Sequence, residues 1–198
     1  MNKDIIICGV GGQGTVLASK IIAAAFSEEG HRVHSAETIG MAQRGGSVVS
    51  HVRIGEEAFS PLIPYGNADI LLGFEPAEAV RNLKYLKKDG TAIVNTTATM
   101  PVTEALKESG YSADKMTEYI RDRYETVFVD ADEVARQFGS NKFFNIVMLG
   151  VAAGSGRLGI DTGILEETVR RNVPAKYADI NLEAFRKGFT TGNAVNHN

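Results

Sequence analysis

The chain has 198 residues, 43% of them hydrophobic and 23% charged, a balance typical of a single globular domain. A net charge of −3, with no basic cluster longer than Lys87-Lys88 or Arg170-Arg171, argues against nucleic acid as a partner. The single cysteine excludes an internal disulfide and a ligand set for an iron–sulfur cluster, and no apolar run approaches the roughly 20 residues of a membrane span, so we expect a cytoplasmic protein.

The first elements predict an α/β sheet. Residues 5–8 form an apolar, β-branched run that suits a central strand covered on both faces. A glycine loop follows, and then an amphipathic helix from Thr15 to about Glu29 that Gly30 ends. A second short strand near residues 32–35 would complete a βαβ opening.

The later pattern alternates strands and helices and then becomes helical. Further strands are predicted at residues 48–54, 70–72, 92–94 and 126–129, with a helix from Pro76 to about Leu86. C-terminal helices are expected from about residue 143, and the tail 190–198 is expected to be frayed. Residues 1–198 are therefore predicted to form one α/β domain, a Rossmann-like open sheet that is mostly parallel, with flanking helices and a helical C-terminal segment.

The first glycine loop matches G-x-G-x-x-G in the required place, after a strand and before a helix. Glycine permits positive φ and close backbone approach, and the helix start beyond the loop offers unpaired N–H groups to an anion. The candidate ligand-binding residues are Gly9, Gly11, Gly12, Gln13 and Gly14. The alternative is a tight turn with no ligand. A dinucleotide site also needs an acid near the end of the second strand, and the nearest one, Glu37, lies inside a further loop, which weakens an NAD assignment.

A second loop, residues 37–47, is 11 residues long, where most α/β connections are shorter. Such loops on a rigid sheet commonly carry function. Arg44 is suited to bind a phosphate or carboxylate, and its alternative role is a structural pair with Glu37 or another carboxylate. The candidate site residues here are Met41, Gln43, Arg44, Gly45 and Gly46.

Other polar residues are weaker candidates. Asn95 and Thr96 end a predicted strand, where open α/β sheets place ligands, and turn capping is the equal alternative. Cys8 is interpreted as a small buried hydrophobe and Asn145 as a structural amide that needs a partner if buried. The histidines show no metal-ligand spacing, so neither a metal site nor a catalytic residue is predicted.

Taken together, the two loops resemble a known family. The segments 11–14, 40–48 and 50–53 look like the gamma domain of 2-oxoacid:acceptor oxidoreductases. The Met-Ala-Gln-Arg-Gly-Gly version of the second loop, followed by Ser-Pro-Leu-Ile-Pro at 60–64, is most similar to the small (beta) subunit of indolepyruvate ferredoxin oxidoreductase. Matching segments at 74–76, 95–96, 145–150 and 181–185 extend the resemblance over nearly the whole chain.

The resemblance implies a subunit that is inactive alone and helps to form the active site of a complex. That complex decarboxylates a 2-oxoacid oxidatively on thiamine diphosphate, passes electrons through iron–sulfur clusters to ferredoxin and yields an acyl-coenzyme A. The larger partner subunit would hold thiamine diphosphate and the clusters, and this chain is implicated in binding coenzyme A, directly or by shaping the entrance. Within this frame Arg44 would face coenzyme A phosphates or the substrate carboxylate, while Gln13 and Gln43 donate hydrogen bonds. The rival hypotheses are a stand-alone NAD- or FAD-dependent enzyme and a purely architectural subunit.

Overall fold

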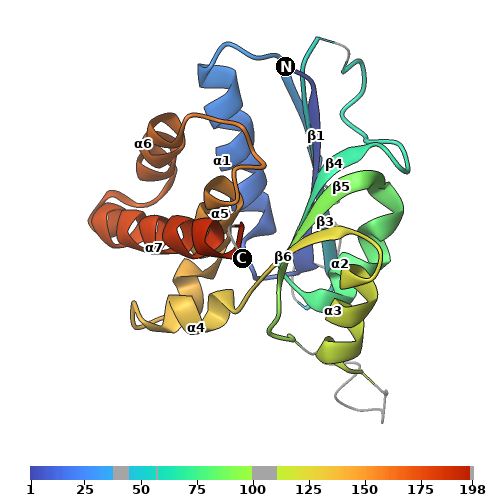
Figure 1. The fold of residues 1–198 in the computed structure, drawn as a ribbon. Helices are drawn as coiled ribbons and strands as arrows, with labels where there is room; N and C mark the ends of the chain where they lie inside the picture. Colours follow the sequence, from blue (N-terminus) through green and yellow to red (C-terminus); the bar gives the residue numbers. More distant parts are fainter. Residues whose placement is uncertain (38–44, 57, 100–110, 197–198) are drawn as a thin grey trace.

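The computed structural model describes residues 1–37, 45–56, 58–99 and 111–196, which form a single sheet covered by helices on both faces (Figure 1). The strands are β1 (Lys3–Val10), β2 (Val33–Glu37), β3 (Ser47–Ile54), β4 (Ala68–Gly73), β5 (Leu86–Asn95) and β6 (Glu125–Val129). The helices are α1 (Thr15–Glu28), α2 (Pro76–Asn82), α3 (Ala113–Arg121), α4 (Ala131–Arg136), α5 (Phe144–Gly154), α6 (Thr162–Asn172) and α7 (Ala178–Asn196). Short 3-10 turns are η2 (Leu83–Tyr85), η3 (Asn141–Phe143) and η4 (Ala175–Tyr177).

The sheet order is β2-β3-β1-β4-β5-β6, which confirms the predicted open and mostly parallel sheet. β1, β4, β5 and β6 pair in parallel, while β3 runs antiparallel to both β1 and β2. The expected βαβ opening therefore needs a correction. β1 and β2 do point the same way, but β3 is inserted between them, because a chain leaving β2 can return at once only as an antiparallel neighbour.

The central strand β1 divides the interior into two cores because its side chains alternate between the faces of the sheet. Ile5 and Ile7 join the larger core under α1, α5 and α7, whereas Ile6 and Cys8 join the smaller core under α2. All four side chains are fully buried. This double burial explains why the run is apolar at every position and not at alternate ones.

Helices α5 and α7 lie against each other through glycines on both sides of their contact. A Cβ added to Gly150 would lie 2.1 Å from the carbonyl oxygen of Phe185, and one added to Gly188 would lie 2.2 Å from that of Val147. The same contact continues one turn further, where a Cβ on Gly192 would lie 2.3 Å from the Val151 oxygen. The frayed tail expected from Thr190 is therefore wrong for residues 190–196, since the close contact extends α7 to Asn196.

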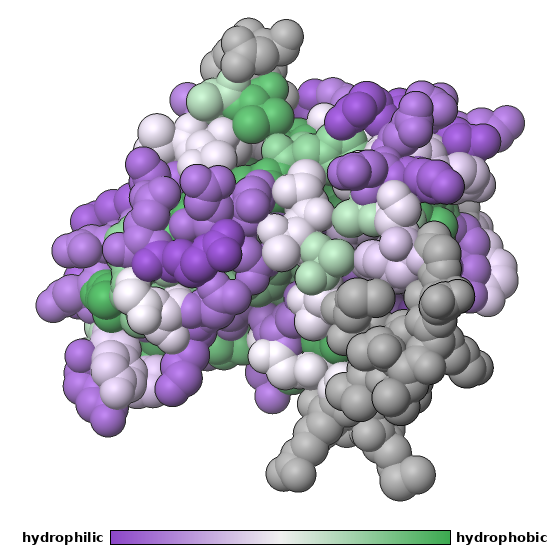
Figure 2. Space-filling model, turned by 90° about the horizontal axis from the view of Figure 1, so that it is seen from below, coloured by the Kyte–Doolittle hydropathy of each residue, from purple (hydrophilic) through white to green (hydrophobic). Residues whose placement is uncertain are grey.

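The parallel strands bring their carboxyl ends to one edge of the sheet, at the bottom of Figure 1. Figure 2 shows this edge from below, where pale and green residues form a band between two hydrophilic surfaces. Ligands bind at this edge in open α/β sheets. Within the described part of the chain, no helix has the length and apolar character needed to cross a membrane.

Candidate functional site

The two glycine loops lie side by side at the carboxyl edge and are joined by backbone hydrogen bonds. The N–H of Gly11 donates to the Gly46 carbonyl at 2.8 Å, and the N–H of Gly45 donates to the Gly11 carbonyl at 3.3 Å. Gly45 has a φ of 77°, which a side chain would disfavour. Gly11 of the first loop and Gly45 and Gly46 at the end of the second are therefore joined although they lie more than 30 residues apart in the printed sequence.

Gln13 braces the first loop against the ends of neighbouring strands. Its Oε1 accepts from the Val10 N–H at 2.7 Å, and its Nε2 donates to the Phe74 carbonyl at 3.1 Å and to the Thr99 hydroxyl at 3.2 Å. Both amide hydrogens thus have partners within the protein. The expected role of Gln13 as a hydrogen-bond donor to a ligand is not what this geometry shows, because the short loop directs the amide inward.

Helix α1 begins at the end of the first loop without a side-chain cap. Gly14 is its N-cap, with φ 82° in the left-handed region, and it has no side chain to accept from the first N–H groups of the helix. These N–H groups have no partner within the helix itself. Together with the helix dipole they make the start of α1 a favourable place for a negative charge.

A cavity of about 400 Å³ opens at this helix start. It is lined by Gly11, Gly12, Gln13, Gly14, Thr99, Asp132, Asn141, Lys142, Phe144 and Asn145. We call it the glycine-loop cavity. Four of the predicted loop residues meet in it, and it also takes residues from η3 and α5 that the sequence did not assign to the site.

Asn145 and Lys142 supply polar groups to this cavity. Asn145 is only 7% exposed, and a Cβ placed on Gly14 would lie 2.6 Å from its Nδ2 atom. Among the described residues, no hydrogen bond of the Asn145 side-chain amide is found, and its atoms are not among the fully buried polar atoms that lack a partner, so the amide is open to the cavity that it lines. The Lys142 side chain is exposed, and within the same ranges its ammonium forms no ion pair. A cation and an amide therefore line the cavity at the start of α1.

Asn95 and Thr96 hold the edge of the sheet together. Asn95 is fully buried; its Nδ2 donates to an Asp132 carboxylate oxygen at 2.9 Å, and its Oδ1 accepts from the Ala131 N–H at 3.0 Å. The Thr96 N–H and hydroxyl both donate to the Val129 carbonyl. Asn95 and Thr96 therefore make the contacts expected of the alternative role, the capping of a turn. Three further predicted site residues, Met41, Gln43 and Arg44, lie outside the described residues.

A second group of polar side chains, around Glu75, is buried at the same edge. Glu75 is 1% exposed, accepts from the Glu78 N–H at 2.9 Å as the cap of α2, and accepts from the Tyr111 hydroxyl. Glu78, also 1% exposed, accepts from the Ser47 hydroxyl at 2.6 Å. Burial raises the pKa of the Glu75 carboxyl above its ordinary value, the hydrogen bonds from Tyr111 and Glu78 oppose this, and the Glu78 charge adds to the rise.

This raised pKa predicts a pH dependence of folding. A carboxyl whose pKa is higher in the folded state stabilises the fold below its unfolded pKa, and this contribution is lost as the pH rises through the folded value. Glu75→Gln keeps an acceptor for the Glu78 N–H and removes the charge. As the pH rises above 4.5, the ordinary pKa of a glutamate, the free energy of unfolding should therefore fall less for the variant than for the wild type. Urea unfolding at a series of pH values measures this free energy, and the exposed Glu118→Gln is the control. Parallel curves of unfolding free energy against pH for Glu75→Gln and the wild type would contradict the raised pKa of Glu75.

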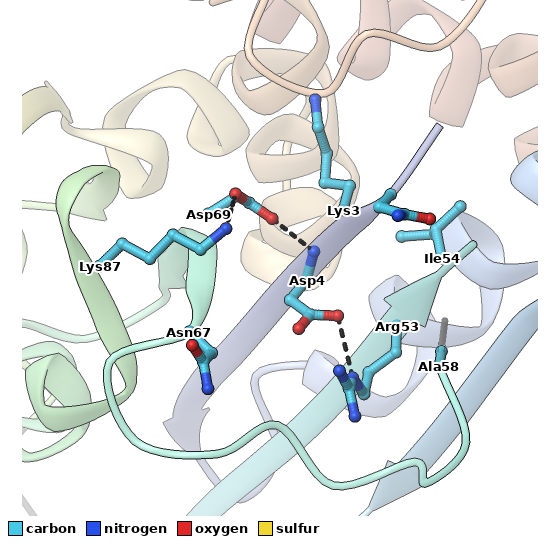
Figure 3. A pocket seen from close by; sticks show the side chains of 9 residues that line it. Lys3, Asp4, Arg53, Ile54, Ala58, Asn67, Asp69 and Lys87 are labelled. Atoms are coloured by element: carbon cyan, nitrogen blue, oxygen red, sulfur yellow. Dashed lines mark hydrogen bonds and ion pairs between the residues drawn. The ribbon is translucent and has the colours of Figure 1, made fainter. Parts of the chain in front are cut away.

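The opposite edge of the sheet holds a charged cavity of about 280 Å³ (Figure 3). Its charges are paired: Arg53 donates to Asp4 at 3.0 Å, and Asp69 accepts from both the Lys87 ammonium and the Asp4 N–H. Lys3 extends from the same strand start and donates to the Arg157 and Leu158 carbonyls. These contacts hold the beginnings of β1, β4 and β5 together.

Cys8 and His51 are both buried in the interior of the protein. Cys8 is fully buried, and burial followed by the nearby Glu78 and Glu75 raises its pKa well above the ordinary thiol value, which makes it a poor nucleophile. His51 is 5% exposed and its Nδ1 accepts from the Ile63 N–H at 3.2 Å. Among the described residues, no three His, Cys, Asp or Glu side chains group so as to hold a metal ion.

Residues 4–191 match the model of the pyruvate ferredoxin/flavodoxin oxidoreductase family, so the chain belongs to this family. It is 39% identical to the indolepyruvate oxidoreductase subunit IorB of Archaeoglobus fulgidus over 96% of this chain and 94% of that protein. It is 38% identical to the same subunit of Methanothermobacter thermautotrophicus over 96% and 97%. The resemblance seen in the sequence is confirmed.

Solved structures share the fold. A keto/oxoacid ferredoxin oxidoreductase gamma subunit from Geobacter sulfurreducens superimposes with a TM-score of 0.72 at 23% identity, covering 97% of this chain and 99% of that one. A 2-oxoglutarate:ferredoxin oxidoreductase from Magnetococcus marinus, solved with 2-oxoglutarate, coenzyme A and succinyl-CoA bound, gives a TM-score of 0.75 at 21% identity. The match includes 98% of this chain and 31% of that longer chain. The protein is thus a small subunit of a multi-subunit 2-oxoacid:ferredoxin oxidoreductase.

The sequence did not indicate that Asn145 and Lys142 line the glycine-loop cavity. Asn145 was interpreted as a structural amide, although a lone amide near the start of an otherwise apolar helix was a usable signal for this position. Lys142 immediately precedes that helix in η3. The missing information was the position of α5, which depends on its glycine contact with α7.

Proposed function

We propose that this subunit forms one wall of the active site of an aryl 2-oxoacid:ferredoxin oxidoreductase, where its glycine-loop cavity binds the phosphates of coenzyme A. The complex would decarboxylate the oxoacid and deliver an acyl-coenzyme A. The aryl type is inferred from relatives named for indolepyruvate. The observation that carries the proposal is the uncapped start of α1, which opens into a cavity lined by the Lys142 ammonium and the Asn145 amide.

Each feature of the cavity suits a phosphate. Helix N–H groups and a lysine ammonium favour a negative charge, and Asn145 can donate a hydrogen bond through its Nδ2. Both oxygens of Asp132, the carboxylate on the cavity wall, accept hydrogen bonds from protein amides, those of Asn95 and Asn141 at 2.9 and 2.8 Å. The glycines let a bulky diphosphate approach the backbone closely.

The catalytic cofactors are proposed to lie on the larger partner. Thiamine diphosphate would supply the carbanion chemistry and iron–sulfur clusters would carry electrons to ferredoxin. The single cysteine of this chain is buried in the sheet and cannot ligate a cluster. Met41, Gln43 and Arg44, next to Gly45 in the chain, are proposed to extend the phosphate-binding surface toward the partner, with Arg44 as its second cation.

Lys142→Ala tests the proposal in the reconstituted complex. Because a charge-assisted contact to a phosphate is lost, the KM for coenzyme A should rise about tenfold. The kcat at saturating coenzyme A should change little, since the phosphates are bound equally in ground and transition states. Lys187→Ala, an exposed lysine on α7, is the matched control. An unchanged KM for Lys142→Ala would reject the role of this cavity.

A further inference from the structure

The connection between β3 and β4 exposes several large apolar side chains. Phe59, Leu62 and Tyr65 are 85%, 58% and 66% exposed. They are three of the seven large hydrophobic side chains that are exposed in the described part of the chain. A single exposed apolar residue is ordinary, whereas several together mark a surface that another molecule covers. We call residues 58–65 the apolar loop.

Contacts from the sheet hold the apolar loop in place. Ile63 is 3% exposed in the smaller core, and its N–H donates to the His51 Nδ1 at 3.2 Å. Arg53 donates through one guanidinium nitrogen to the carbonyls of Ser60 and Leu62 at 3.0 and 3.3 Å. The loop also contains two prolines, which restrict its backbone. The exposed side chains are therefore carried on an ordered backbone, which loses little conformational entropy when a partner binds.

A cation and a second aromatic ring adjoin the apolar loop at η2. The Tyr65 ring lies 4.9 Å from the Tyr85 ring, and the Lys84 ammonium lies 5.1 and 5.5 Å from their centroids. Lys84 is exposed, and among the described residues its ammonium forms no ion pair. Two rings beside an ammonium suit an apolar surface that also carries a carboxylate.

This surface lies at the other end of the sheet from the glycine loops. The connection leaves β3 at Ile54, which pairs with Lys3 at the start of β1, and it enters β4 at Ala68. Figure 1 shows it at the top of the molecule, whereas the carboxyl edge is at the bottom. A partner that binds the apolar loop therefore leaves the glycine-loop cavity accessible.

We propose that the apolar loop is a contact surface for the larger subunit of the complex, which meets it with an apolar hollow beside a carboxylate. The chain is a small subunit of a multi-subunit oxidoreductase, so part of its surface is covered in the assembly. A second copy of this chain matches the surface poorly. A two-fold contact would set the same residues against themselves and give Lys84 a like charge instead of a carboxylate.

Sedimentation velocity of the assembled complex over a dilution series measures the dissociation constant between the subunits. Leu62→Ala and Tyr65→Ala remove exposed side chains and leave the core intact. The matched control is Tyr119→Ala, because this tyrosine on α3 is 45% exposed and also lies beside a cation, with the Arg123 guanidinium carbon 3.7 Å from its ring centroid. Oxidative footprinting of Tyr65 and Tyr119, in the complex and in the isolated full-length chain, reports which ring is covered.

Leu62→Ala and Tyr65→Ala should each raise the dissociation constant about tenfold or more, the loss expected for one interface anchor, and Tyr119→Ala should leave it unchanged. Tyr65 should be protected from oxidation in the complex only. Unchanged dissociation constants, or equal oxidation of Tyr65 in both samples, would overturn the proposal. Protection of Tyr65 by self-association of the isolated chain would also overturn it, in favour of a second copy.

This proposal and the proposed function fail separately. When the subunit concentration saturates assembly, the KM for coenzyme A of Leu62→Ala and Tyr65→Ala should equal that of the wild type, because these side chains lie away from the glycine-loop cavity. The test of that cavity through Lys142→Ala is therefore independent of the outcome at the apolar loop.

Discussion

Gly150→Ala should lower the free energy of unfolding by about 3 kcal/mol or more. The added Cβ would lie 2.1 Å from the Phe185 carbonyl oxygen and 2.8 Å from the Phe189 nitrogen. Both are backbone atoms of α7, so no side-chain rotation can relieve the overlap, and the two helices must separate. Because a close-packed interior does not absorb such a shift, the loss should appear directly in the urea midpoint.

The control is the same substitution in another helix. Gly163 lies exposed in α6, where an added Cβ would meet only the Asp161 Oδ1 at 3.1 Å. Gly163→Ala should therefore raise the free energy of unfolding by about 0.5–1 kcal/mol, since alanine has the better helix propensity. If Gly150→Ala were as stable as the wild type, the close contact between α5 and α7 would be refuted.

Gly14→Ala should have the second largest effect and should act on both stability and ligand binding. An alanine at φ 82° is strained by about 1–2 kcal/mol, and its Cβ would lie 2.6 Å from the buried Asn145 Nδ2. Relief requires that Asn145 or the start of α1 move, and both line the glycine-loop cavity. We expect a loss of about 2–4 kcal/mol in the free energy of unfolding and a rise in the KM for coenzyme A of about tenfold or more.

Gly30→Ala separates the two causes. Gly30 has φ 84° just beyond the end of α1, outside the glycine-loop cavity, and a Cβ there would meet nothing within 4 Å among the described residues. This variant should lose stability through backbone strain alone and should keep a KM for coenzyme A near that of the wild type. If Gly30→Ala and Gly14→Ala raised the KM equally, the contact between Gly14 and Asn145 would not be what shapes the cavity.

Local sequence pattern was sufficient for the elements whose cause is local. The apolar run at residues 5–8 predicted a central strand, and it is one, because both faces of β1 are covered. The C-terminal helices predicted from about residue 143 begin with η3 and α5, and Asp161 caps α6. In each case the residue type and its neighbours in the chain decide the conformation.

What the sequence did not predict depends on contacts between distant segments. The position of β3 between β1 and β2 is set by pairing across the sheet, which no local pattern encodes. Helix α3 was missed, although Ser112 caps it. Glu166 pairs with Arg186 at 2.7 Å because α7 packs against α6.

For the candidate site, the glycines were predictable and the polar partners were not. A G-x-G-x-x-G pattern between a strand and a helix located the start of α1 because the motif has a fixed structural context. The sequence did not show that Gly11 of this motif donates a hydrogen bond to Gly46 of the second loop, because that contact depends on the fold. Gln13 was assigned to the ligand on residue type alone, whereas its three hydrogen bonds inside the protein fix it as a brace.

The most direct test is a structure of the assembled complex with coenzyme A bound. Our account predicts that the diphosphate lies in the glycine-loop cavity, within hydrogen-bonding distance of the first N–H groups of α1, the Asn145 amide and the Lys142 ammonium. Coenzyme A bound with its phosphates held only by the partner subunit, and this cavity filled by solvent, would contradict it.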